Sequence, residues 1–156
     1  MANVKAASRR WLYGDQHPNR VAELLNRGTA ALVAAGIGPK RMVRLEVLGR
    51  RTGRRRAFPV VIADYEGQRY LVAMLGESAN WVRNVRVVGG KAALRHGRRE
   101  EVILEEPDPG MRAPILRRYL EAAPGGRAHF PIDQGALLEQ FERIAEQYPV
   151  YRIRAG

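Results

Sequence analysis

The densest cluster of residues that could bind a ligand is a run of arginines in the first half of the chain. Residues 41–56 contain seven arginines (at 41, 44, 50, 51, 54, 55 and 56) and one acid, Glu46. Within this run, residues 49–55 (GRRTGRR) predict a turn bounded by glycines, which let backbone N–H groups approach a ligand closely. Arginine forks on either side suit a phosphate group. From composition alone, the run favours an anion site and a solvated basic hairpin about equally.

A second group, residues 78–84 (SANWVRN), combines a tryptophan with two asparagines. Asn80 and Asn84 are four residues apart and therefore share one face of a helix. An asparagine near the mouth of a barrel could bind a ligand amide or cap a neighbouring loop. Trp81 is more often a core anchor than a ligand contact.

A third group, residues 128–131 (AHFP), holds His129, a candidate proton donor, although a single loop histidine is more often exposed or packed. No neighbouring residues form a Ser/His/Asp triad, and a GxSxG motif is absent. The chain has no cysteine, which excludes disulfides and thiolate metal sites. Its three histidines are scattered without ligand spacing, so we expect no metal site.

The composition is that of one soluble domain over residues 1–156. Lys+Arg is 27 and Asp+Glu is 16, so the net charge is +11, and 24 of the cations are arginines. This charge predicts an acidic partner, whether nucleic acid, a membrane surface or an anionic small molecule. No apolar run is long enough to span a membrane, and the N-terminus lacks a secretory core. We therefore expect a cytoplasmic protein, with a peripheral membrane contact left open.

The periodicity of apolar residues predicts a mainly antiparallel chain with helices near both ends. We expect strands over residues 42–48, 57–65, 69–75, 91–95, 99–104 and 150–153, and helices over 18–35, 78–88, 108–122 and 133–147. Ser78 and Asp133 are the expected N-caps of two helices, and Pro59 places its strand at a sheet edge or a bulge. Because hairpins make most of the connections, we expect an α+β fold, a small antiparallel barrel with flanking helices.

Two of these segments resemble one family. Residues 49–59 (GRRTGRRRAFP) are similar to the G-R-K/R-S/T-G-x-x-R-x-x-P stretch of deazaflavin-dependent nitroreductases and quinone reductases. Residues 80–85 (NWVRNV) resemble the P-x-W-x-x-N-L/V segment of the same proteins. The resemblance covers about residues 40–106 well and the C-terminal third loosely. The loop at residues 76–80 is shorter than the family's and lacks its lysine and proline, and the family's C-terminal tyrosines do not carry over one to one.

The resemblance implies a split β-barrel of the flavin-mononucleotide-binding type. It also implies 8-hydroxy-5-deazaflavin (coenzyme F-420) as the cofactor, which carries a phosphodiester and an oligoglutamate tail, with FMN as the nearest alternative. The residues implied to bind the phosphate and tail are Arg50, Arg51, Thr52, Gly53 and Arg56. Those implied to lie around the ring or near the phosphate are Pro59, Met74, Leu75, Gly76, Trp81 and Asn84.

The implied activity is hydride transfer from the reduced cofactor to a quinone, nitro or other activated unsaturated acceptor. The proton that must follow could come from water or from Tyr119, His129 or Tyr148. A non-catalytic carrier of deazaflavin or flavin on the same barrel is the main alternative. A nucleic-acid binder is disfavoured, because the basic turn lacks the aromatic residues that RNA modules interleave. Split barrels often dimerise, so a homodimer is a further expectation.

Overall fold

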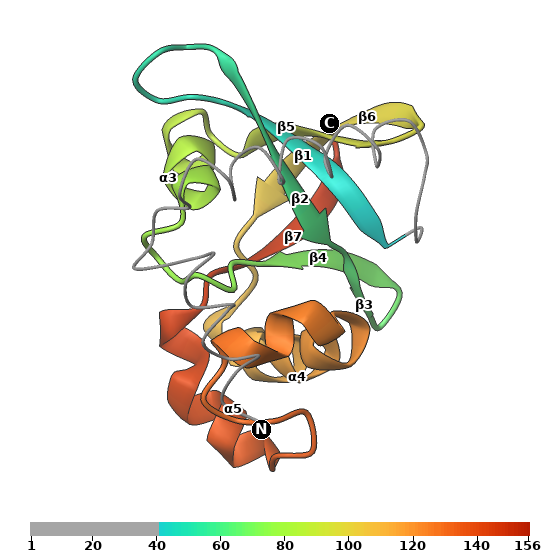
Figure 1. Ribbon diagram of the computed structural model, residues 1–156, viewed down its shortest axis with the longest axis vertical. Helices are drawn as coiled ribbons and strands as arrows, with labels where there is room; N and C mark the ends of the chain where they lie inside the picture. Colours follow the sequence, from blue (N-terminus) through green and yellow to red (C-terminus); the bar gives the residue numbers. More distant parts are fainter. Residues whose placement is uncertain (1–40) are drawn as a thin grey trace, which may run out of the picture.

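The computed structural model describes residues 41–156 (Figure 1). The helix predicted over residues 18–35 lies outside the described residues. Seven strands form one antiparallel sheet with the order β2-β1-β5-β6-β7-β4-β3. They are β1 (Met42–Leu48), β2 (Arg55–Val61), β3 (Ala63–Tyr65), β4 (Gln68–Val72), β5 (Lys91–His96), β6 (Arg98–Glu105) and β7 (Val150–Ala155).

The sheet curls until its two edges are joined by one continuous stretch of chain. β2 and β3 lie at opposite edges of the described sheet, yet only Ile62 separates them in sequence. Ile62 is buried, and its N–H donates to the carbonyl oxygen of Arg41 at 2.7 Å. The single strand predicted over 57–65 is therefore wrong, because closing the barrel requires the chain to bend at Ile62. Pro59 lies on edge strand β2, as predicted.

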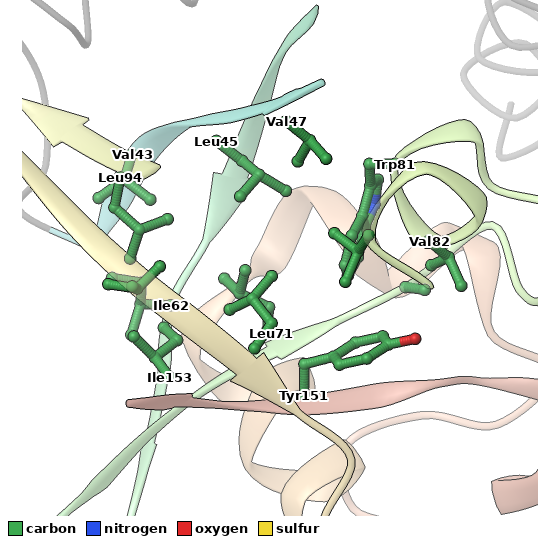
Figure 2. Packing of buried hydrophobic residues seen from close by; sticks show 14 of the residues in the cluster. Val43, Leu45, Val47, Ile62, Leu71, Trp81, Val82, Leu94, Tyr151 and Ile153 are labelled. Atoms are coloured by element: carbon green, nitrogen blue, oxygen red, sulfur yellow. The ribbon is translucent and has the colours of Figure 1, made fainter. Parts of the chain in front are cut away.

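The inner face of the barrel carries the first hydrophobic core (Figure 2). In β1, Val43, Leu45 and Val47 point inward because alternate residues of a strand share a face. Helix α3 (Asn80–Val87) covers one end of the barrel with Trp81, whose ring meets Tyr151 edge-on at a centroid distance of 5.7 Å. Trp81 is therefore a core anchor of this barrel end. Ala79, with no side-chain hydrogen bond, precedes the helix, so the predicted cap at Ser78 is wrong.

The helical layer packs on the outer side of β3, β4 and β7 and makes the second core. It consists of α4 (Arg112–Ala122) and α5 (Leu138–Ile144), with short 3-10 turns at Pro109–Met111, Pro124–His129 and Ala145–Gln147. The predicted start of the last helix at Asp133 is wrong. Asp133 Oδ1 instead accepts the N–H of Gly135 at 2.9 Å in a turn, and Gln140 Oε1 accepts the N–H of Leu137 at the true start of α5. Local side-chain bonds here compete with helix formation.

The predicted hairpin around His96 and Gly97 is confirmed as the β5–β6 pair.

The end of the barrel remote from α3 is bridged by an ion pair. Arg69 of β4 donates to both carboxylate oxygens of Glu100 of β6, at 2.6 and 3.1 Å. Among the helices of residues 41–156, none is long and apolar enough to cross a membrane.

Candidate functional site

Residues 49–56, which we call the basic turn, connect β1 to β2 and are closed by bonds within the turn. The N–H of Gly49 donates to the carbonyl of Arg54 at 2.7 Å, and the N–H of Gly53 donates to the carbonyl of Gly49 at 2.9 Å. Gly53 has φ +66°, a conformation that favours glycine. A Cβ at Gly49 would lie 3.1 Å from the hydroxyl of Thr52. Both glycines therefore set the shape of the turn.

The arginines of the basic turn have no acidic partner within residues 41–156. Glu46, the acid nearest in sequence, is buried on β1 and faces Arg44 at 3.8 Å and Arg99 at 3.9 Å. It therefore does not pair with the turn. The guanidinium groups without a carboxylate partner among residues 41–156 are those of Arg50, Arg51, Arg54, Arg55 and Arg56. Within this part of the chain, their charge and those of their donors that make no other bond remain available for an anion.

The structure brings the two motifs of the sequence into contact at Asn84. Asn84 lies on α3 and is only 3% exposed. Its side-chain oxygen accepts the backbone N–H of Arg50 at 3.2 Å and the Arg50 Nη1 group at 2.9 Å. These bonds join positions 34 residues apart in the chain, so the basic turn and α3 form one site.

Arg56 is the member of the turn that shares a face with the barrel core. In the β1–β2 register it lies opposite Val47, whose side chain is in the first core. Phe58 and Val60 follow at alternate positions and pack against the same core. Arg56 therefore lies on the inner face of the edge strand, whereas Arg55 lies on the outer one.

Residues 74–76 lie in the connection between β4 and α3. The N–H of Gly76 donates to the carbonyl of Ala73 at 2.9 Å, and Gly76 has φ +82°. Leu75 packs against the first core and Met74 against the second. In Figure 1, α3 lies between the basic turn and this connection. The two groups of predicted contact residues therefore flank the same helix.

Two of the three candidate proton donors, Tyr119 and Tyr148, pack beside Phe130 in the second core, and His129 directly precedes Phe130 in the chain. The Phe130 ring lies 6.0 Å from the ring of Tyr119 and 4.4 Å from that of Tyr148, measured between centroids. Tyr119 donates to Met74 Sδ at 3.5 Å, and Tyr148 donates to the carbonyl of His129 at 3.2 Å. Burial raises the pKa of Tyr119 to about 12 and also raises the pKa of Tyr148. Both phenols are therefore weaker acids than an exposed tyrosine.

Arg86 is a structural residue that sequence reasoning missed. It holds α3 in place by donating to Glu77 at 2.6 Å and to Glu106 at 3.1 Å. The bond from Arg86 lowers the pKa of Glu77. Glu77 and Glu106 lie 9 and 20 residues from Arg86, so no local spacing signals the network.

Among the described residues, no group of three or more His, Asp or Glu side chains could hold a metal ion.

Comparison with known proteins agrees with this arrangement. A family model described as "F420H(2)-dependent quinone reductase" matches residues 20–120. No curated protein matches the sequence significantly.

Solved structures with the same fold share little sequence with the chain. One described as a domain-swapped dimer has 16% identity and a TM-score of 0.54, covering 86% of this chain and 94% of its own. A heme binding protein from Mycobacterium smegmatis has 16% identity and a TM-score of 0.51, covering 81% of this chain and 51% of its own. These two likenesses confirm the split-barrel fold. An F420-H2 dependent reductase (FDR-A) has 15% identity and a TM-score of 0.48, covering 74% and 95%.

Proposed function

Because the chain belongs to the F420H(2)-dependent quinone reductase family, we propose that it reduces a quinone, a nitro compound or another activated unsaturated acceptor. Membership makes the chain an oxidoreductase whose cofactor is the deazaflavin coenzyme F-420. The observation that carries the proposal is the basic turn, whose arginines have no acidic partner among residues 41–156 and which is tied to α3 by Asn84. FMN is the secondary candidate, since its phosphate would suit the same turn.

The basic turn fits the anionic end of the cofactor. A phosphodiester and a carboxylate tail offer acceptors only, and the turn offers guanidinium and N–H donors. We assign the phosphate and tail to Arg50, Arg51, Thr52, Gly53 and Arg56. The hydroxyl of Thr52 accepts the N–H of Arg54 at 3.2 Å, so its own hydrogen is left to donate to the phosphate.

We assign the ring end to the other side of α3, near Met74, Leu75 and Gly76. Gly76 has positive φ, and a Cβ added there would lie 3.1 Å from the carbonyl oxygen of Gln147, so glycine suits this position and exposes its backbone without a side chain. Pro59 shapes the edge strand, and Trp81 supports the site from within the core. When bound, the reduced deazaflavin supplies the hydride. The residues around it would orient the acceptor and exclude water.

For the proton that follows the hydride, the candidates are water, Tyr119, His129 and Tyr148, and two observations disfavour the tyrosines. Tyr119 and Tyr148 already donate their hydroxyl hydrogens, and burial raises the pKa of each. If His129 is the donor, His129→Gln should change the pH profile of turnover, whereas Tyr148→Phe should leave the profile unchanged.

The direct test follows the oxidation of the reduced deazaflavin by purified protein with a quinone and, separately, with a nitroaromatic acceptor. The proposal expects turnover with at least one of them, and none with reduced FMN in place of the deazaflavin. Tight deazaflavin binding without oxidation by any acceptor would instead favour the carrier. Binding of DNA or RNA with a steep salt dependence would favour the nucleic-acid alternative.

A homodimer belongs to the same proposal, supported by the fold shared with the domain-swapped dimer. Sedimentation of the purified protein checks it. The peripheral membrane contact expected from charge stays a prediction.

A further inference from the structure

Asn84 occupies a position where an apolar residue would be expected. The other buried residues of α3, Trp81, Val82 and Val85, are all apolar. Among residues 41–156, Asn84 and Glu46 are the two buried side chains outside the apolar and tyrosine set. A buried amide is tolerated only when its polar atoms find partners. The buried Asn84 side chain therefore needs a hydrogen-bond partner within the protein.

That partner is the first arginine of the basic turn. The backbone N–H and the Nη1 group of Arg50 both donate to the same Asn84 oxygen. The other bonds of residues 49–54 stay within the turn, between Gly49 and Arg54, Gly53 and Gly49, and Arg54 and Thr52. Within the part of the chain that the structure describes, the Asn84 bonds are thus the hydrogen bonds that attach this segment to another element.

We propose that Asn84 is a positioning residue that presets the basic turn for the cofactor's phosphate. Its side-chain oxygen accepts two bonds from Arg50, and a phosphate, which offers acceptors only, cannot replace either donor there. The orienting effect of this oxygen therefore passes through Arg50. Holding the Arg50 N–H and one of its five side-chain donors fixes the backbone from which Arg51, Thr52 and Gly53 follow. This inference rests on the proposed function, because the anion in question is the deazaflavin's phosphate.

The physical gain lies in preorganisation. A turn of residues 49–54 held only by its own bonds would have to become ordered when the cofactor binds, which lowers affinity. Anchored to a helix that Arg86 in turn fixes to Glu77 and Glu106, the turn is already ordered. Removing the anchor should therefore weaken binding of the phosphate-bearing cofactor and leave the ring end unaffected.

The test combines a measurement on the cofactor-free protein with one on binding. In Asn84→Ala, amide-resolved hydrogen exchange of Arg50 should become about tenfold faster, because its N–H loses a buried acceptor. Asn84→Asp keeps an acceptor oxygen at the same place and should keep exchange slow. Val87→Ala, an exposed residue of the same helix, is the matched control and should change neither readout.

For binding, Asn84→Ala should raise the Kd of the complete deazaflavin cofactor about five- to tenfold. It should leave the Kd of a deazaflavin lacking phosphate and tail unchanged, which also shows that the variant is folded. Unchanged Arg50 exchange, or equal weakening of both ligands, would overturn the inference. If the wild-type protein binds neither deazaflavin, the proposed function fails, and faster Arg50 exchange in Asn84→Ala would still support the positioning of the turn.

Discussion

Two arginine-rich regions of this barrel differ in whether their arginines are paired with carboxylates. Where β6 meets β7, Glu105 accepts a hydrogen bond from Arg152 and forms an ion pair with Arg154, each at 2.9 Å. Glu105 and Arg152 are register partners, so the sheet itself places acid against base. Where β1 turns into β2, five arginines lie within residues 49–56 and meet no carboxylate among the described residues.

Pairing with a carboxylate distinguishes arginines that contribute to the fold from arginines that could bind a ligand. Paired surface arginines contribute little to stability individually and attract no further anion strongly. Unpaired arginines repel one another and are retained at some cost to the folded state. The net charge of +11 is therefore a weaker guide to the partner than the position of the arginines that meet no carboxylate among the described residues.

The largest expected effect comes from removing the uncompensated charge. We expect Arg51→Ala combined with Arg56→Ala to weaken deazaflavin binding about 100-fold at low salt, because each arginine can make a charge-assisted bond to phosphate. The melting temperature should stay the same or rise. Fluorescence titration and thermal melts measure the two quantities. Equal affinity in the double variant would remove the basic turn from the site.

A smaller effect should follow from straining the turn without changing its charge. Gly53→Ala places a side chain at φ +66° and should destabilise the protein by about 1 kcal/mol. Binding should weaken about tenfold if the turn's shape, and not only its charge, holds the phosphate. Urea unfolding and cofactor titration check this, with Gly110→Ala as a control at a glycine without positive φ and with open space around it.

A second ion pair of the barrel, Arg69 with Glu100, should lose its contribution to stability in acid. The bond from Arg69 lowers the pKa of Glu100 below its ordinary value. The pair therefore stabilises the fold above that ordinary value, about 4.3, and the contribution is lost as pH falls through the folded pKa. Since both side chains are more than a third exposed, Glu100→Gln should cost only about 0.5–1 kcal/mol at pH 7.

The difference in unfolding free energy between wild type and Glu100→Gln should narrow below about pH 4, as followed by urea unfolding across pH. Deazaflavin affinity should not change. A constant difference down to pH 2 would contradict the assigned pairing.

The smallest effect is expected for Arg154→Ala. This substitution also removes a positive charge, but one paired with Glu105, which Arg152 still holds. Stability should change by less than about 0.5 kcal/mol, and deazaflavin affinity should remain at the wild-type value. A loss of affinity comparable to that of the basic-turn variants would mean that overall charge matters and location does not.

The sequence predicted those features of the fold that depend on neighbouring residues. The alternation of Val43, Leu45 and Val47 identified β1, and the turn at Gly97 identified the β5–β6 hairpin. The bend at Ile62 could not be predicted, because it arises when the sheet closes on itself. The start of α5 was misplaced because the Asp133 side chain bonds Gly135 in a turn instead of capping the helix.

The candidate site was predictable only where it depends on residues that are neighbours in the sequence. The arginines and glycines of residues 49–56 are contiguous, so composition was enough to single them out. That these arginines have no carboxylate partner among residues 41–156 was not evident, since Glu46 is close in sequence but faces Arg44 and Arg99. The role of Asn84 depends on a contact with Arg50 across 34 positions, which only the folded chain reveals.

The central claim is that the uncompensated arginines of the basic turn hold the phosphate end of a deazaflavin cofactor. Fluorescence titration of the purified protein with coenzyme F-420 at low and at high salt tests it most directly. The account predicts binding at micromolar concentration or tighter in low salt, with affinity falling steadily as salt screens the arginines. Absence of binding in low salt, or an affinity that does not respond to salt, would contradict it.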